Sequence, residues 1–256
     1  MDTDIVIALL GVAAAAGWLD AVVGGGGLVL LPALLAAAPS APVATLLGTN
    51  KLSSIFGLTS AAASYARKVT MDRRVLLATV ALALAGSALG AGLAGALSNE
   101  ALRPLVMLVL LLALVVVVLY PGMGATPDPG LRTPRRVTTA VVVAGVGLSL
   151  YDGLAGPGTG VFLVLVFTTI IGLDFVRASA SAKVVNVATN LGALTVFALN
   201  GHVMWGLGVG LAACSVLGAH LGARTAIRRG AGFVRLILVV VVLALFTKLG
   251  YDQFLA

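Results

Sequence analysis

Apolar residues fill most of this chain in eight long stretches, which short polar connections separate. Most of the stretches have roughly the 20 residues that an α-helix needs to cross a bilayer. The stretches cover about 4–38, 42–66, 75–98, 101–120, 137–172, 174–199, 203–225 and 232–250. The pattern predicts an all-α, polytopic membrane protein.

Two of the stretches, 4–38 and 137–172, are too long for one crossing, and glycine-rich segments interrupt both. Glycine and proline weaken a helix, so we expect a broken, re-entrant-like helix in each stretch. The segment 121–136 is rich in proline, glycine and arginine and forms the only long linker. We therefore predict a first transmembrane repeat over 1–120, a cytoplasmic linker over 121–136 and a second repeat over 137–256.

Composition supports the membrane class, because 60% of the residues are hydrophobic, 10% are charged and the mean hydropathy is +1.14. The formal net charge is +7, but the basic residues cluster in connections between apolar stretches, as topology signals do. This distribution argues against a nucleic-acid partner. A single cysteine, Cys214, excludes an intramolecular disulfide.

The two halves carry one pattern twice without gaps, at an offset of 132 residues. Asp20, Gly24, Gly26, Val29, Leu31 and Lys51 correspond to Asp152, Gly156, Gly158, Val161, Leu163 and Lys183. Internal repeats of membrane segments are typical of transporters that bind substrate where the repeats meet.

The positive-inside rule distinguishes two topologies. If every stretch crosses fully, lysine and arginine divide eight to six between the two faces. If each broken stretch returns to its own side, they divide twelve to two, and only Arg103 and Lys248 lie opposite the rest. The second topology gives each half three crossings. It predicts inverted repeats, with both termini external.

In this topology the lysines lie deep in the membrane. Lys51 follows the turn at Pro39 to Pro42 by about nine residues, or ~14 Å of helix. Gly26 lies about as deep, and Lys183 and Gly158 stand in the same relation to the turn at 172–174. Broken helices also direct the partial positive charge of their N-termini toward the middle of the membrane. Two lysines and two helix N-termini predict an anion site.

The residues expected to bind the anion are the glycines of the breaks, the lysines and the polar side chains around them. They are Gly24, Gly25, Gly26, Gly27, Thr49, Asn50, Lys51, Ser54, Gly156, Gly158, Thr159, Ser181, Lys183 and Asn186, with Ser53 and Asn190 as further donors. Two structural alternatives remain open. Glycines in membrane helices often serve close packing, and hydroxyls often bond to helix carbonyls.

Asp20 and Asp152 precede the two breaks and have two candidate roles. They can be permanent counter-ions of the buried lysines. Alternatively, they can bind and release a proton during transport, as buried carboxyl groups in pumps and transporters do. The sequence does not decide between these roles.

The glycine-rich segments also resemble a known family. The segment 17–32, GWLDAVVGGGGLVLLP, followed by 44–51, ATLLGTNK, resembles the first motif of the sulfite exporter TauE/SafE family of bacterial membrane permeases. The segments 153–160, GLAGPGTG, and 178–183, ASASAK, resemble the second copy, and the resemblance covers nearly the whole chain. Pro157, Thr159 and Val164 depart from the first copy, so the second break has its own shape.

The resemblance implies movement of sulfite, an organosulfonate or a related sulfur oxyanion across the bacterial inner membrane, driven by an ion gradient. We expect alternating access without a cofactor or a metal, with the lipid bilayer and the small anion as partners. The sequence leaves open a monomer or a homodimer, the identity of the oxyanion and the direction of transport. A passive anion channel is the main alternative. An intramembrane enzyme is disfavoured, because Cys214 and His220 lie six residues apart, on different faces of one helix.

Overall fold

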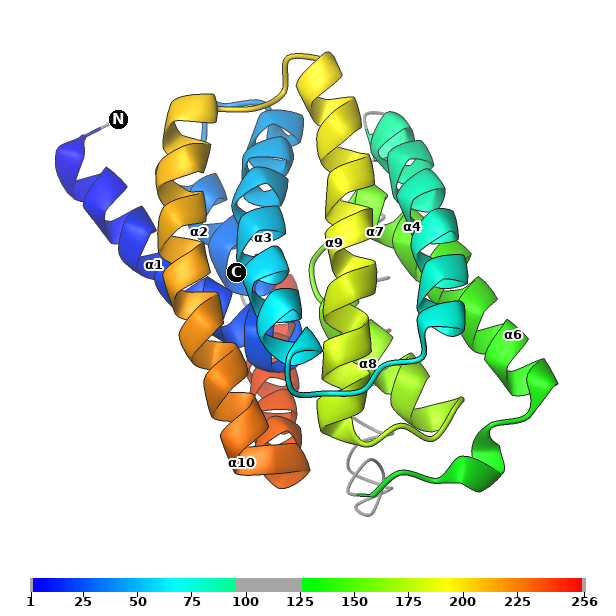
Figure 1. Cartoon of the computed structure of the whole chain (residues 1–256). Helices are drawn as coiled ribbons and strands as arrows, with labels where there is room; N and C mark the ends of the chain where they lie inside the picture. Colours follow the sequence, from blue (N-terminus) through cyan, green and yellow to red (C-terminus); the bar gives the residue numbers. More distant parts are fainter. Residues whose placement is uncertain (1, 95–125, 255–256) are drawn as a thin grey trace.

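The structure is a computed structural model that describes residues 2–94 and 126–254, with the side chains of Val242 and of 245–254 excepted. Within these ranges all regular structure is helical (Figure 1). The first part holds α1 Thr3–Val23, α2 Gly27–Ala37, α3 Val43–Ala66 and α4 Arg73–Leu93. The second part holds a 3-10 turn η2 Pro129–Leu131, α6 Pro134–Val142, a π-helical segment η3 Val143–Leu148, α7 Ser149–Leu154, α8 Thr159–Thr169, α9 Phe175–Leu199 and α10 Trp205–Phe254.

Five of the described helical spans are long and apolar enough to cross a membrane, which agrees with the predicted polytopic class. They are Thr3–Val23, Arg73–Leu93, Pro134–Leu154, Phe175–Leu199 and Trp205–Val241. The 24 residues of α3 are not among them, because this helix carries a polar face with Asn50 and Lys51. The stretch 101–120 with Arg103 and the first part of the linker, 121–125, lie outside the described residues, as does the side chain of Lys248.

Both long apolar stretches are interrupted at the glycine-rich segments. α1 ends at Val23 and α2 begins at Gly27, whereas α7 ends at Leu154 and α8 begins at Thr159. Gly24, Gly156 and Gly158 each have a φ of 84°, in the left-handed region that favours glycine. The breaks therefore follow from the local sequence.

Helices that correspond by the 132-residue offset run in opposite directions in Figure 1. α3 begins at the upper edge of the view and ends at the lower edge, while α9 runs from the lower edge to the upper. α4 rises from the lower edge, and α10 descends from the upper one until Gly230 interrupts its helical backbone. α3 and α9 contact each other directly, with α10 packed against α3 and α4 packed against α9.

Glycines allow the outer helices to approach closely. α1 packs against α10, where a Cβ on Gly218 or Gly222 would collide with the backbone of Ala14 or Trp18. α7 packs against α4 in the same way, since a Cβ on Gly90 would collide with the backbone of Leu150. Small residues let membrane helices approach at backbone distance, so these glycines serve packing.

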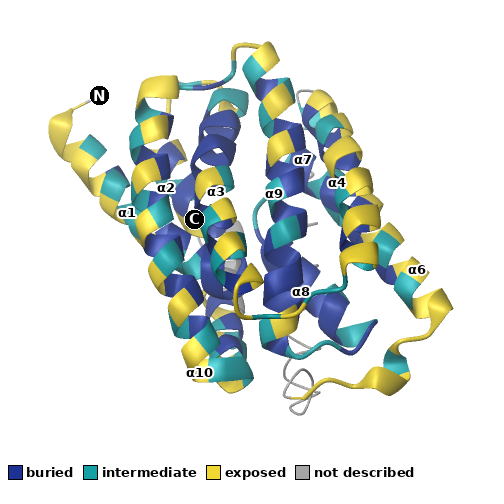
Figure 2. Cartoon of the chain, viewed as in Figure 1, coloured by how far each residue is buried: buried dark blue, intermediate teal, exposed yellow. Residues whose placement is uncertain are grey.

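Burial concentrates where the helices of the two parts meet (Figure 2). Buried residues dominate α8 and α9, whereas α1, α4 and α10 expose apolar side chains on their outer faces. Leu77, Leu89 and Leu217, for example, are exposed. Exposed leucines on the outside of an apolar bundle fit contact with lipid.

Candidate functional site

The two helix breaks touch each other inside the bundle. A Cβ built on Gly24 would lie within 3 Å of the backbone of Gly160, and a Cβ on Gly160 would meet Gly24 in the same way. Only glycine at both positions permits this approach. The contact places the broken ends of α1 and α8 side by side, and polar side chains of α3 and α9 surround them.

An ion pair joins the two halves of the chain at this point. Nζ of Lys51 donates to Oδ2 of Asp152 at 2.6 Å, and each side chain is 3% exposed. A lone charge in such surroundings costs several kcal/mol, so the two groups stabilise each other's ionised forms. Gly156 leaves the space for the ammonium group, because a Cβ there would lie 2.9 Å from Nζ of Lys51.

The corresponding lysine and aspartate have a different arrangement. Lys183 is fully buried, and its Nζ has no hydrogen-bond partner among the residues that the structure describes. Oδ1 of Asp20 accepts a hydrogen bond from the backbone N–H of Gly26 at 3.2 Å, across the first break. One lysine is therefore tightly paired, and its counterpart is not.

A small central cavity lies between the breaks, α3 and α9. Its volume is about 20 Å³. Its walls comprise Asp20, Gly24, Gly27, Asn50, Lys51, Ser54, Asp152, Gly156, Gly158, Gly160, Asn186 and Asn190. Roughly 10–15 Å³ suffices for one water molecule, so this cavity is too small for a sulfur oxyanion. Binding of an anion here requires the two halves to move apart.

Nine of the residues expected at the anion site line this cavity, and so do both coupling candidates, Asp20 and Asp152. The nine are Gly24, Gly27, Asn50, Lys51, Ser54, Gly156, Gly158, Asn186 and Asn190. Gly160 lines it as well and is absent from the expected set, although it belongs to the same glycine-rich segment. The cavity thus combines a cation, two carboxylates, amides and a hydroxyl.

Seven expected residues do not line the cavity, among them Ser53, whose buried hydroxyl has no partner within the described residues. Thr49 hydrogen-bonds to the backbone at Thr45 and Met204, and Thr159 donates to the carbonyl of Gly156. Gly25 packs near Val241 and Leu19, and Gly26 lies against Asp20. Lys183 is buried outside the cavity, and Ser181 faces a separate pocket.

The cavity holds polar atoms with unused hydrogen-bonding capacity. Oδ1 of Asn50 is buried and has no partner within the described parts of the chain. Asn186 is more fully bonded, because its Oδ1 accepts from Oγ1 of Thr189 at 3.0 Å and from Nδ2 of Asn190 at 3.1 Å. Unpaired buried polar atoms are costly, so the α3 wall favours a polar ligand or water over an apolar one.

A tyrosine that the sequence did not single out supports the second break. The hydroxyl of Tyr151 donates to the carbonyl of Pro157 at 2.7 Å. The corresponding position in the first half is Leu19, which cannot form this bond. The two breaks therefore have different internal supports. Within the described residues no group of three or more His, Cys, Asp or Glu side chains could hold a metal ion.

Comparisons with known proteins agree with the predicted class of membrane protein. The family model described as sulfite exporter TauE/SafE matches residues 9–249. A probable membrane transporter protein, ORF9, from Sinorhizobium sp is 37% identical over 237 residues, which cover 93% of this chain and 89% of that protein. A probable membrane transporter protein from Haemophilus influenzae is 32% identical over 250 residues, covering 98% and 96% of the two chains. The Escherichia coli K12 protein YfcA, also a probable membrane transporter protein, is 32% identical over 242 residues, with 94% and 88% covered. No solved structure matches the chain significantly.

Proposed function

Because the chain belongs to the sulfite exporter TauE/SafE family, we propose that it is a secondary transporter of a small sulfur oxyanion, such as sulfite or an organosulfonate. The observation that carries this proposal is the buried ion pair between Lys51 and Asp152, which joins the two halves at the helix breaks. A buried cation at the meeting point of two repeats is where many transporters hold substrate.

The two halves are proposed to be inverted repeats that rock about the central cavity. The 132-residue offset and the opposite directions of α3 and α9 support this arrangement. In the proposed topology the arginine-rich connections are cytoplasmic and both termini are external, in the bacterial inner membrane. The lipid bilayer is then a partner of the exposed apolar faces, and a homodimer is compatible with this topology.

We propose that the anion replaces Asp152 as the partner of Lys51. When a proton neutralises Asp152, the ammonium group of Lys51 loses its counter-ion, and an anion can take that place without leaving an unpaired buried charge. The pair then carries one proton and one monovalent anion together, so the charge of the site is unchanged. Movement of the anion is thereby coupled to the proton gradient.

Lys183 and Asp20 are proposed to perform the corresponding step in the other orientation of the halves. Lys183 lacks a hydrogen-bond partner among the described residues, while Lys51 is paired. Alternation between the two lysines would follow from the repeat, since each half supplies one lysine and one aspartate. The glycines of the breaks, notably Gly156, leave space for the ammonium group and for the ligand.

Flux in proteoliposomes tests this proposal against the passive channel. A transporter that binds its anion saturates with concentration and responds to an imposed pH gradient, whereas flux through a channel does neither at comparable concentrations. Lys51→Ala is expected to abolish sulfite flux, and Lys51→Arg to retain part of it. Normal saturable flux in Lys51→Ala would reject the proposal.

A further inference from the structure

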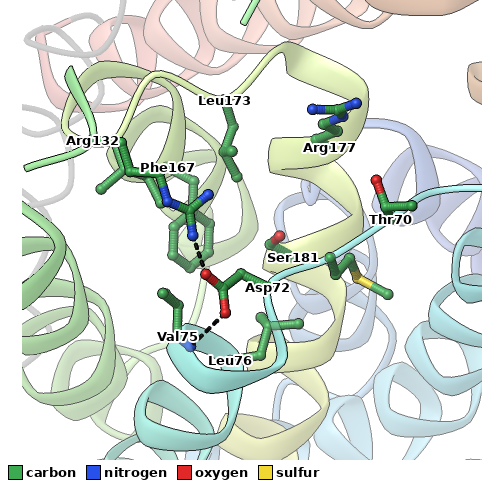
Figure 3. A pocket seen from close by; sticks show the side chains of 11 residues that line it. Thr70, Asp72, Val75, Leu76, Arg132, Phe167, Leu173, Arg177 and Ser181 are labelled. Carbon is green, nitrogen blue, oxygen red and sulfur yellow. Dashed lines mark hydrogen bonds and ion pairs between the residues drawn. The ribbon is translucent and has the colours of Figure 1, made fainter. Parts of the chain in front are cut away.

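A larger pocket lies apart from the central cavity and shares no lining residue with it. Its volume is about 300 Å³, at the lower end of the range for small-molecule sites. The start of α4, the end of α8, the linker and the first turns of α9 form its walls. Figure 3 shows Arg132 and Phe167 on one side of this pocket, Arg177 and Thr70 on the other, and Ser181 between them.

Weak ion pairs hold the two guanidinium groups of the pocket. Arg132 pairs with Asp72, and the two side chains are 38% and 35% exposed. Arg177 lies 3.4 Å from Asp174 and is 48% exposed. Exposed pairs of this kind contribute little free energy, so an anionic ligand can compete for both arginines. Both aspartates also cap helices, which keeps them in place.

Ser181 supplies a buried polar group at the floor of the pocket. The residue is 5% exposed, and the exposed part lines the pocket. Figure 3 shows this hydroxyl directed into the pocket. A hydroxyl that lines a pocket can donate a hydrogen bond to a ligand oxygen.

Beside Thr70 and the carboxylate of Asp72, the rest of the wall is apolar and includes Leu76, Phe167 and Leu173. The linker is fixed against this wall, because Nε of Arg136 donates to the carbonyl of Ile170 at 2.8 Å and the N–H of Asp128 donates to the carbonyl of Gly172 at 2.8 Å. The pocket therefore combines two cations, the carboxylate of Asp72 that an anion would displace from Arg132, a hydroxyl and an apolar surface. This combination suits a small organic anion rather than a bare inorganic one.

We propose that this pocket is a second anion site, which binds a small organosulfonate through Arg132, Arg177 and Ser181 and places its alkyl group against Phe167 and Leu173. The pocket lies among the arginine-rich connections, so the ligand enters from that side. Transfer onward to the central cavity rests on the proposed transport function. Helix α9 links the two sites, since Ser181 precedes Asn186 by five residues, or ~7.5 Å of helix.

Protection of a cysteine tests binding without requiring transport. In a Cys214→Ser background, Ser181→Cys is labelled with a maleimide in the detergent-solubilised full chain, with ethanesulfonate as the probe. Saturating ethanesulfonate is expected to slow labelling at least fivefold, and not to slow labelling of Arg135→Cys, an exposed position outside the pocket. Equal labelling of Ser181→Cys with and without ethanesulfonate would overturn the proposal. Protection by vesicles of phosphatidylglycerol, but not by ethanesulfonate, would overturn it in favour of a lipid headgroup.

A second pair of variants separates this site from the central one. Arg177→Gln is expected to raise the ethanesulfonate concentration for half-protection about tenfold, and the matched control Arg135→Gln to leave it unchanged. Lys51→Ala is expected to leave protection intact even though it abolishes flux. If Lys51→Ala transports normally, the proposed function fails and the pocket stands. If the ethanesulfonate concentration for half-protection is the same in Arg177→Gln as in the parent protein, the pocket proposal fails and the proposed function stands.

Discussion

Nζ of Lys51 lies 2.6 Å from Oδ2 of Asp152, which is 101 residues further along the chain. The pair connects α3 of the first half with α7 of the second, beside the break that contains Gly156. Among the described residues it is the one fully buried ion pair, since the pairs of Arg132 and Arg177 are partly exposed. Removal of either member changes both the stability of the fold and the charge of the cavity.

Single substitutions in this pair are expected to destabilise the protein more than the double substitution does. Lys51→Met leaves the carboxylate of Asp152 buried without a partner, which costs about 3–5 kcal/mol. Lys51→Met with Asp152→Leu removes both charges and should recover most of that loss. Thermal unfolding in detergent measures this difference. A double variant as unstable as the sum of the single variants would show that the two groups do not stabilise each other.

Gly156→Ala is expected to disrupt the site directly. The φ of 84° disfavours any residue with a Cβ, at a cost of roughly 1–2 kcal/mol, and the new methyl group would lie 2.9 Å from Nζ of Lys51. Flux should fall at least tenfold. Gly11→Ala is the matched control, because no atom outside the local helical backbone lies within 4 Å of a Cβ at that position. Similar losses in both variants would indicate a general sensitivity of the fold.

Substitutions at Thr49 and Ser54 should distinguish a hydroxyl that stabilises the fold from one that binds the ligand. Oγ1 of Thr49 accepts from the N–H of Met204 at 2.9 Å, so Thr49→Val leaves that N–H unpaired and lowers stability by about 1–3 kcal/mol. Ser54 lines the cavity, so Ser54→Ala should instead raise the half-saturating sulfite concentration. Transport kinetics and melting temperatures of both variants measure the contrast. An altered affinity in Thr49→Val alone would reverse these assignments.

Reagents applied from one side of the membrane test the inverted topology. With Cys214→Ser as background, Lys68→Cys in the α3–α4 connection should react with an impermeant maleimide only from the cytoplasmic side. Asn200→Cys, in the α9–α10 connection, should react only from outside. The two connections lie at opposite edges of the bundle (Figure 1). Reaction of both cysteines from one side would contradict the proposed arrangement.

Much of the fold is predictable from the sequence because hydropathy determines which segments can cross a membrane. The glycine-rich segments also indicate where α1 ends and α8 begins, whereas the contact between Gly24 and Gly160 is evident only in the structure. The π-helical turns of η3 leave no such signal, since Val143–Leu148 is an ordinary apolar segment. Likewise, the sequence provides two lysines and two aspartates but not their pairing, which depends on how the halves pack.

The individual site residues were predictable only in part, because proximity in sequence does not specify a helix face. Thr49 lies two positions before Lys51, or about 200° around the helix, and it faces the α9–α10 connection. Ser181 stands in the same relation to Lys183 and lines the other pocket. Asn186 and Asn190 are one turn apart, and both line the central cavity. The helical repeat therefore predicts which neighbouring residues share a face of the helix. It does not predict the shape of the cavity, which depends on how the helices pack.

Proton uptake on anion binding is the most direct test of whether sulfite and Asp152 compete for Lys51. Calorimetric titration with sulfite near neutral pH, in buffers of different ionisation enthalpy, measures the number of protons taken up per bound anion, after correction for protonation of sulfite itself. The wild-type chain is expected to take up about one proton, because Asp152 must be neutralised when Lys51 binds the anion. Asp152→Asn is expected to bind sulfite without that proton. Binding without proton uptake in the wild type, or the same uptake in both proteins, would contradict the exchange of partners at Lys51.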